Sequence, residues 1–216
     1  MAEKYDYWFE TKSGIKIYEY EKKRLEEALN GCKGKLLDVG CGSGLFTLIP
    51  IEKNLEVFGL DFSRAMVKKA KEKGVRVILA DAYHLPVKEN FFDVVLLFTT
   101  LEFLEENIVL NEIKRVLKSG GWLILGVHNR LNPWNLYRKI KAKLKKESAY
   151  KTIRYYSISN LKKTLRKNSF KLESVSTCIL LPSPNTKTEF ILGMLEKLSL
   201  KIGAIIVAKA KLEAKN

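Results

Sequence analysis

The chain has 216 residues, and its content of 46% hydrophobic and 10% aromatic residues is typical of a globular protein with a sizeable core. No apolar run approaches the roughly 18–20 residues that span a bilayer, and the N-terminus lacks the apolar region of a signal peptide, so we expect neither a transmembrane helix nor secretion. The net charge of +15 favours an anionic partner, the alternative being the Lys- and Glu-rich, Gln-free surface of a thermophile.

The first 34 residues predict a helical lead-in. Several aromatic residues come first (Tyr5, Tyr7, Trp8 and Phe9). A turn is then expected at Ser13-Gly14, followed by a charged helix over about Tyr18–Asn30.

A glycine-rich loop follows the first predicted strand, Leu36–Val39, and leads to a helix expected from about Leu45. It carries glycines on alternate positions, Gly40, Gly42 and Gly44. Glycine suits a sharp turn whose backbone approaches a ligand, and free amides at a helix start favour a hydrogen-bond acceptor or an anion. The third glycine comes one residue too early for the dinucleotide pattern Gly-x-Gly-x-x-Gly, and Asp38 precedes the loop. The plain alternative is a βα turn without a ligand.

Strands and helices alternate from this loop to Val127. We expect helices at Arg64–Lys73, capped by Ser63, and at Glu105–Lys118, ended by Ser119-Gly120-Gly121. The strands expected in this region are Glu56–Leu60, Arg76–Ala80, Phe92–Phe98 and Trp122–Val127. This alternation predicts a parallel sheet with helices on both faces.

The pattern then gives a helix at Ser157–Asn168 and, after a Pro182-Ser183-Pro184 break, a second helix at Thr188–Leu200. Two further strands are expected at Lys171–Leu181 and Gly203–Ala210, the second inserted late into the sheet. The predicted fold class is therefore α/β, a Rossmann-like seven-stranded, mostly parallel sheet with helices on both faces and an antiparallel last strand.

Nearly all of the excess positive charge lies between residues 129 and 171, which hold fourteen Lys or Arg and a single acid, Glu147. Four residues there recur at helical spacing and predict an amphipathic basic helix: Trp134, Tyr137, Ile140 and Leu144. Such a segment could meet an anionic membrane surface or RNA, or it could be a cover helix with a solvated face.

Two acids end predicted strands at the edge where an open α/β sheet binds its ligand. Asp61 ends the second strand and could accept hydrogen bonds from both hydroxyls of a ribose. Asp81 ends the third strand, where it could receive an exocyclic amine such as adenine N6.

With these motifs the sequence resembles the class I S-adenosylmethionine-dependent methyltransferases, in the group of quinone-biosynthesis and small-molecule enzymes. The resemblance covers about residues 35–127. It is carried by Leu37-Asp38-Val39-Gly40-Cys41-Gly42-Ser43-Gly44, Gly59-Leu60-Asp61-Phe62-Ser63, Asp81-Ala82 with Leu85-Pro86, Phe91-Phe92-Asp93-Val94-Val95, and Glu112 to Gly121.

The resemblance implies S-adenosyl-L-methionine as cofactor, S-adenosyl-L-homocysteine as product, and no metal. The loop of Gly40, Cys41, Gly42 and Gly44 would lie against the methionine part of the cofactor, and Asp38 would bind an amide or, through water, the ammonium. Asp61 would bind the ribose. The remaining contacts implied are Phe62 and Met66 beside adenine, Asp81 and Ala82 at its edge, Phe98, Thr99 and Leu101 beneath the sulfonium, and Tyr5 and Trp8 as a cover.

The sequence departs from the family after the fourth strand, where many relatives have Leu-Glu-His and this chain has Leu101-Glu102-Phe103. His128, after the fifth strand, is the better candidate for a general base, because His84 lies in a loop. A base is not obligatory, since positioning the acceptor supplies much of the rate.

We therefore expect a single methyltransferase domain over 1–216, with 1–34 as lead-in and 129–160 as a basic substrate cover. The acceptor would be a small or lipid-like molecule methylated on O, C or N, by a cytoplasmic monomer or homodimer. The three scattered cysteines agree with a reducing compartment. The alternatives are methylation of RNA (tRNA) or protein through the basic 129–171 segment, an NAD-binding oxidoreductase, and a binding protein without turnover.

Overall fold

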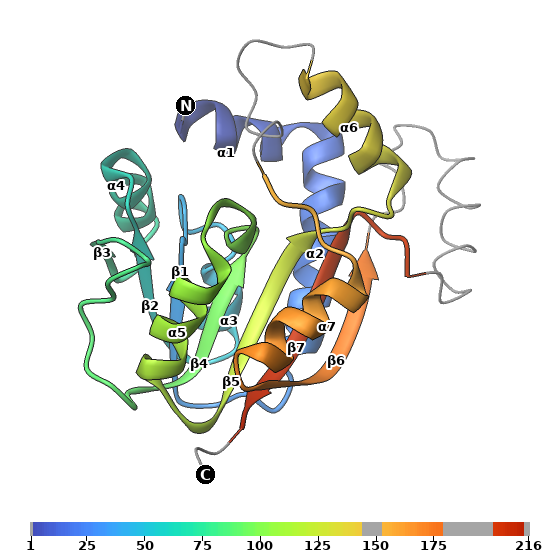
Figure 1. The fold of residues 1–216 in the computed structure, drawn as a ribbon. Helices are drawn as coiled ribbons and strands as arrows, with labels where there is room; N and C mark the ends of the chain where they lie inside the picture. The colour runs from blue at the N-terminus through green and yellow to red at the C-terminus, as the bar shows by residue number, and fades with distance from the viewer. Residues whose placement is uncertain (1, 144–152, 179–200, 214–216) are drawn as a thin grey trace.

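A seven-stranded sheet forms the centre of the protein, in a computed structural model that describes residues 2–143, 153–178 and 201–213 (Figure 1). The strand order is β3-β2-β1-β4-β5-β7-β6. The neighbours from β3 to β5 are parallel, and β7 runs antiparallel to both β5 and β6. The fold class and the late insertion of the last strand are confirmed. The strands are β1 (Lys35–Val39), β2 (Glu56–Asp61), β3 (Val77–Leu79), β4 (Phe92–Phe98), β5 (Leu117–His128), β6 (Phe170–Cys178) and β7 (Ile205–Leu212).

Helices cover both faces of this sheet. They are α1 (Ala2–Glu10), α2 (Lys12–Leu29), α3 (Leu48–Glu52), α4 (Arg64–Glu72), α5 (Glu106–Val116), α6 (Pro133–Lys143) and α7 (Ile158–Lys167), with a 3₁₀ turn η1 (Leu101–Phe103). In β4, Val95 and Leu97 pack with α5 and α7, whereas Val94 and Leu96 pack with α2 and α3. All four are fully buried, which explains why the strand reads as a continuous apolar run.

The boundary between α5 and β5 differs from the prediction. The helix ends at Val116 and the strand starts at Leu117, where Leu117 already pairs with Phe92. Gly120 has a φ of +71°, and the pairing register of β5 with β4 shifts beside it. The Ser-Gly-Gly sequence therefore makes an irregularity within a long strand instead of ending the helix, and the two uses of glycine look alike in sequence.

One turn and one helix start were also wrongly predicted. Ser13-Gly14 lies inside α2, because Thr11 caps this helix by accepting a hydrogen bond from the Gly14 amide at 3.1 Å. Gly14 also lets the end of α1 approach, since a Cβ there would lie 2.0 Å from the Trp8 carbonyl oxygen. The helix after the glycine loop begins at Leu48 and not Leu45, so the loop does not lead directly into helical amides.

Polar contacts hold the basic helix α6, and two of the apolar positions that the spacing singled out are exposed. Tyr137 and Ile140 are exposed, while Asn135 and Ala142 are buried. The Asn135 side-chain amide donates to the carbonyls of Asn129 at 2.9 Å and Ala204 at 2.7 Å. Asparagine hydrogen bonds to the backbone thus fix this helix above the carboxyl end of β5, a role that hydrophobic periodicity cannot detect.

Some predicted features lie outside the described residues. These are Leu144, the proline break at 182–184, the helix expected at 188–200, and the last residues of the strand expected at 171–181. Among the helices of the described ranges, none is long and apolar enough to cross a membrane.

We predict that Asn135→Ala destabilises the protein by about 2–3 kcal/mol, since it removes two buried hydrogen bonds, while each carbonyl keeps one backbone donor, the amide of Asn132 or of Asn129. The expected fall in Tm is about 5–15 °C by differential scanning calorimetry. Asn107→Ala, on the exposed side of α5, is the matched control and should stay within about 0.5 kcal/mol of wild type. Equal stability of the two variants would contradict the structural role of Asn135.

Candidate functional site

The glycine loop, residues 40–44, follows the carboxyl end of β1 and is hydrogen-bonded to the carboxyl end of the neighbouring strand β2. The Gly40 and Cys41 amides donate to the Leu60 carbonyl at 2.7 and 3.0 Å. Gly40 has a φ of +75°, and a Cβ there would lie 2.4 Å from the Thr100 side chain. Conformation and close approach therefore both demand glycine at this position. The loop presents backbone at the edge of the sheet, as expected for a ligand cradle.

Asp61 ties the loop to the start of α4. Its Oδ2 accepts a hydrogen bond from the Gly42 amide at 2.9 Å, and its Oδ1 accepts one from the Ser63 amide at 2.8 Å. The residue is 6% exposed. A carboxylate offers about four acceptor positions, so two remain for the hydroxyls of a ribose. This chemistry fits the expected cofactor.

Asp38 lies beneath the loop rather than in it. The residue is 2% exposed, and its Oδ2 accepts a hydrogen bond from the Thr47 hydroxyl at 2.6 Å. Burial raises the pKa of Asp38 to about 7; the Thr47 hydrogen bond opposes this shift, and the Asp61 charge adds to it. The observed partner is thus a side-chain hydroxyl, and a contact of Asp38 with the cofactor stays a prediction.

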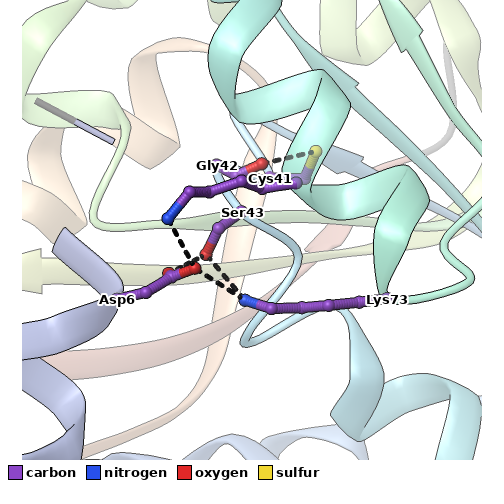
Figure 2. Close-up of polar contacts among 6 residues, drawn as sticks. Asp6, Cys41, Gly42, Ser43 and Lys73 are labelled. Atoms are coloured by element: carbon purple, nitrogen blue, oxygen red, sulfur yellow. Dashed lines mark hydrogen bonds and ion pairs between the residues drawn. The ribbon is translucent and has the colours of Figure 1, made fainter. Parts of the chain in front are cut away.

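Cys41 packs inward below the same loop. Its thiol lies 3.8 Å from the Gly42 carbonyl, and burial raises its pKa, so the sulfur stays protonated (Figure 2). Gly59 leaves room for it, because a Cβ there would lie 2.9 Å from the Cys41 sulfur. A cofactor contact at this position would therefore come from the backbone.

The residues predicted around adenine lie at and just after the ends of β2 and β3 and differ in exposure. Phe62 is 83% exposed, Met66 is partly buried, and the Ser63 hydroxyl caps the helix that carries Met66. Asp81 is exposed and accepts the Tyr83 amide at 2.9 Å, while Ala82 is buried. An exposed phenylalanine beside two polar strand ends suits a planar ring, and these contacts stay predictions.

The three residues predicted beneath the sulfonium, at the end of β4, differ in their surroundings. The Phe98 ring stacks on Phe46 with centroids 4.5 Å apart, and Leu101 is fully buried in the core. Both side chains are buried, and their contacts with the cofactor stay predictions. Thr99 adopts a φ of +53°, a strained conformation for a β-branched residue that costs about 1–3 kcal/mol.

Helix α1 is attached to the glycine loop by one carboxylate, as Figure 2 shows. Asp6 accepts a hydrogen bond from the Ser43 hydroxyl at 2.5 Å and forms ion pairs with Lys69 at 3.3 Å and Lys73 at 3.2 Å. Burial opposes the charge, but the Ser43 hydrogen bond and the two ammonium groups outweigh it and hold the pKa of Asp6 below its usual value.

This contact places the predicted cover next to the loop. Phe9 packs against Phe46 with ring centroids 5.9 Å apart, and Trp8, 42% exposed, meets Phe9 edge-on. The side chain of Tyr5 lies outside the described part of the chain. Sequence analysis found the aromatic residues of α1 but missed Asp6, because an acid at a terminus gives no signal of its own.

A second polar cluster lies beyond the end of β4. His128 Nδ1, at the end of β5, lies 2.5 Å from Glu102 Oε1, and the Glu102 side chain is fully buried. Glu21, on α2, is 6% exposed; burial raises its pKa to about 8, Arg138 on α6 lowers it, and the Glu102 charge raises it. The Tyr155 ring lies 6.0 Å from that of His128.

The sequence prediction found His128 and missed the residues around it: Glu21, Glu102, Arg138 and Tyr155. They come from four separate segments, so no spacing rule links them. Only Glu102 could have been noticed from sequence, because it occupies the place of the glutamate in the Leu-Glu-His of many relatives. Phe103 is 56% exposed, and His128 supplies the imidazole beside this glutamate from a different strand. In the described ranges we find no group of three or more His, Cys, Asp or Glu that could hold a metal.

Comparison with known proteins agrees with this geometry. A methyltransferase-domain profile matches residues 37–125. An uncharacterised protein of Methanocaldococcus jannaschii is 35% identical over 171 residues, covering 79% of this chain and 78% of that protein. A Staphylococcus aureus demethylmenaquinone methyltransferase is 36% identical over 113 residues, 48% of this chain and 47% of that enzyme.

A solved structure from Thermotoga maritima, described as a SAM-dependent methyltransferase and possible histamine N-methyltransferase, has a TM-score of 0.73 and 26% identity. The match covers 98% of this chain and 95% of that one. The chain therefore belongs to the class I S-adenosylmethionine-dependent methyltransferases, and it is an enzyme of that family with that cofactor. The alternative of an NAD-binding oxidoreductase is wrong.

Asp38 makes the stability of the protein depend on pH. Since its pKa rises from 3.8 unfolded to about 7 folded, the folded state binds the proton more tightly. The free energy of unfolding should therefore fall as pH rises from about 4 to 7 and level off above. We predict that Asp38→Asn removes this slope, so that its stability relative to wild type rises by about 2–4 kcal/mol between pH 4 and 8.

The measurement is urea unfolding at several pH values, with Asp93→Asn as the matched control. Burial opposes the charge of Asp93, but Lys118 and the Lys35 amide lower its pKa. The contribution of Asp93 to stability therefore increases with pH, opposite to that of Asp38. The control should lose stability near neutral pH and regain wild-type behaviour in acid. Parallel pH profiles for wild type and Asp38→Asn would contradict the prediction.

Proposed function

We propose that the protein transfers the methyl group of S-adenosylmethionine to a small-molecule acceptor, with His128 as the general base. The observation that carries this proposal is the 2.5 Å contact between His128 Nδ1 and the buried Glu102 at the carboxyl ends of β4 and β5. A carboxylate beside Nδ1 fixes the tautomer and stabilises the imidazolium that forms when Nε2 takes a proton.

For cofactor binding, we propose Asp61 for the ribose hydroxyls and the backbone of residues 40–44 for the methionine part. Phe62 and Met66 would hold the adenine, with Asp81 and Ala82 at its edge. The bound cofactor supplies a methyl group activated by a positively charged sulfur. The chain's own residues orient the acceptor, keep water away and move its proton.

We further propose that residues 129–160 form the acceptor cover of a single domain. The placement of α6 above the carboxyl end of β5 supports this assignment, since Asn129, Asn132 and Asn135 bind the backbone of residues 201–204. The outward side of α6 combines exposed Leu136, Tyr137 and Ile140 with lysines. Apolar and basic residues together suit an anionic lipid surface better than RNA, whose binding surfaces are dominated by charge and stacking.

We predict that Asp61→Ala weakens the binding of S-adenosylmethionine at least tenfold in isothermal titration calorimetry, because two charge-assisted hydrogen bonds to the ribose are lost. 5′-Methylthioadenosine keeps the ribose but lacks the amino-acid part. Its affinity should fall by the same factor from wild type to Asp61→Ala. Asp93→Asn, at the opposite end of the sheet, is the control and should bind as wild type. Unchanged affinity of Asp61→Ala would contradict the ribose assignment.

We predict that His128→Asn lowers kcat by about 10²–10⁴-fold, since the amide keeps a donor for Glu102 but cannot take a proton. Methyl transfer would be followed with radiolabelled S-adenosylmethionine and an acceptor found by screening. The affinity for the cofactor should change less than twofold. His84→Ala, the loop histidine, should be fully active. Wild-type turnover by His128→Asn would show that the base is elsewhere or unnecessary.

A further inference from the structure

Helix α6 presents its apolar side to solvent. Pro133, Leu136, Tyr137 and Ile140 are spaced i, i+3, i+4 and i+7, so they form one stripe along the helix. Pro133 is exposed, and the other three keep 55%, 49% and 56% of their surface. Leu131, just before the helix, is 57% exposed. An amphipathic helix of a globular protein normally turns such a stripe toward the core.

The inward side of α6 is formed mainly by polar residues. Asn135 is buried and binds two backbone carbonyls, Arg138 is partly buried, and Ala142 is buried. These three residues are spaced i, i+3 and i+7, which places them on the side of the helix opposite the stripe. Hydrogen bonds therefore attach α6 to the rest of the fold, while its apolar stripe faces away from it.

Exposed lysines flank the stripe on both sides. The helical repeat places Lys141 on one side of it, and Lys139 and Lys143 on the other. Lys141 Nζ lies 5.5 Å from the centroid of the Tyr137 ring, so this side chain runs along the stripe. Lysine can bury its aliphatic stem on an apolar surface and keep its ammonium group in water. The face therefore combines an apolar centre with a basic margin.

Helix α7 is equally basic but has the usual arrangement. Its Leu161 and Leu165 are buried, and Lys162, Lys163 and Lys167 are exposed. A basic helix whose polar face meets only solvent is expected to look like α7. The positive charge of the protein therefore does not by itself explain the exposed stripe of α6.

We propose that this face of α6 docks the protein on an anionic lipid surface. The proposal rests on the proposed function for the role of residues 129–160 as acceptor cover, and it adds the partner that the cover meets. Leu136, Tyr137 and Ile140 enter the boundary between headgroups and acyl chains, and the flanking lysines bind lipid phosphates. Because α6 lies over the carboxyl end of the sheet, docking brings the end that carries the glycine loop toward the lipid (Figure 1).

Charge and side-chain chemistry favour a lipid surface over two other occupants. Residues 129–171 hold fourteen Lys or Arg and one acid, so a second copy of this chain would bring like charges together around the stripe. Single-stranded RNA needs aromatic rings on which its bases stack. The centre of the stripe is aliphatic, and the Tyr137 ring already stacks on Trp134 with centroids 5.4 Å apart.

The test measures sedimentation of the full chain with vesicles of phosphatidylcholine, alone or mixed equally with phosphatidylglycerol. We expect binding to the mixed vesicles and binding about tenfold weaker or less to phosphatidylcholine alone. Ile140→Ser should lower the partition coefficient about fivefold, because an apolar side chain no longer enters the lipid. Ile108→Ser, at a position 51% exposed on α5, is the matched control and should bind as wild type. Unchanged binding of Ile140→Ser would overturn the proposal.

Two triple variants separate a specific face from general attraction between opposite charges. Replacing Lys139, Lys141 and Lys143 together by Gln should lower binding to the mixed vesicles about 100-fold, roughly fivefold for each lysine. Replacing Lys162, Lys163 and Lys167 of α7 by Gln removes the same charge and should lower it about twofold. The Tm of both variants should stay at the wild-type value, since all six positions are exposed. Equal losses of binding would overturn the proposal.

Vesicle binding requires neither cofactor nor acceptor, so it can be separated from the proposed function. If the protein binds S-adenosylmethionine in calorimetry but does not bind the mixed vesicles, the function stands and the docking inference is wrong. If it binds the vesicles through α6 but not the cofactor, the docking face stands and the proposed function fails. Binding of an RNA oligonucleotide in place of vesicles, or self-association that Ile140→Ser abolishes, would also overturn the inference.

Discussion

The buried carboxylate of Asp61 is the interaction on which the cofactor half of the site depends. Its two oxygens hold the amides of Gly42 and Ser63, and thereby fix the loop after β1 relative to the start of α4. A carboxylate is costly to bury unless donors surround it, and backbone amides are donors that do not move. Gly40 completes the arrangement, because any side chain there would collide with Thr100.

The acceptor half of the site, which contains Glu102, His128 and Glu21, has a buried carboxylate that is not fully hydrogen-bonded. Glu102 is also a buried carboxylate, but only Oε1 has a partner, the imidazole of His128, among the described residues. Burial, together with the charge of Glu102, raises the pKa of Glu21 to about 8. The cofactor half is satisfied by the protein's own backbone and the acceptor half is incomplete, as expected if the first is preorganised and the second is completed by substrate.

The sequence was sufficient to predict features that short-range chemistry determines. The β1 to β5 strands follow from apolar runs, and Gly40, Asp61 and Asp81 follow from positions at strand ends. The prediction was wrong where one residue type has two uses, since Gly120 marks a strand irregularity and not the end of α5. The contacts of Asn135, which fix the inward face of α6, could not be predicted from hydrophobic spacing. Glu21 and Glu102 could not be paired from sequence because tertiary folding alone brings them together.

Two helices lie over the carboxyl end of the sheet, and they are attached by different forces (Figure 1). Helix α6 is bound through asparagine hydrogen bonds to backbone carbonyls, which salt hardly affects. Helix α1 is bound through the packing of Phe9 and through Asp6 with two partly exposed lysines, and the ion pairs weaken as ionic strength rises. Because Ser43 of the glycine loop shares this contact, the attachment of α1 and the geometry of the cofactor loop are coupled. The side of the site next to the cofactor is therefore the more sensitive to salt.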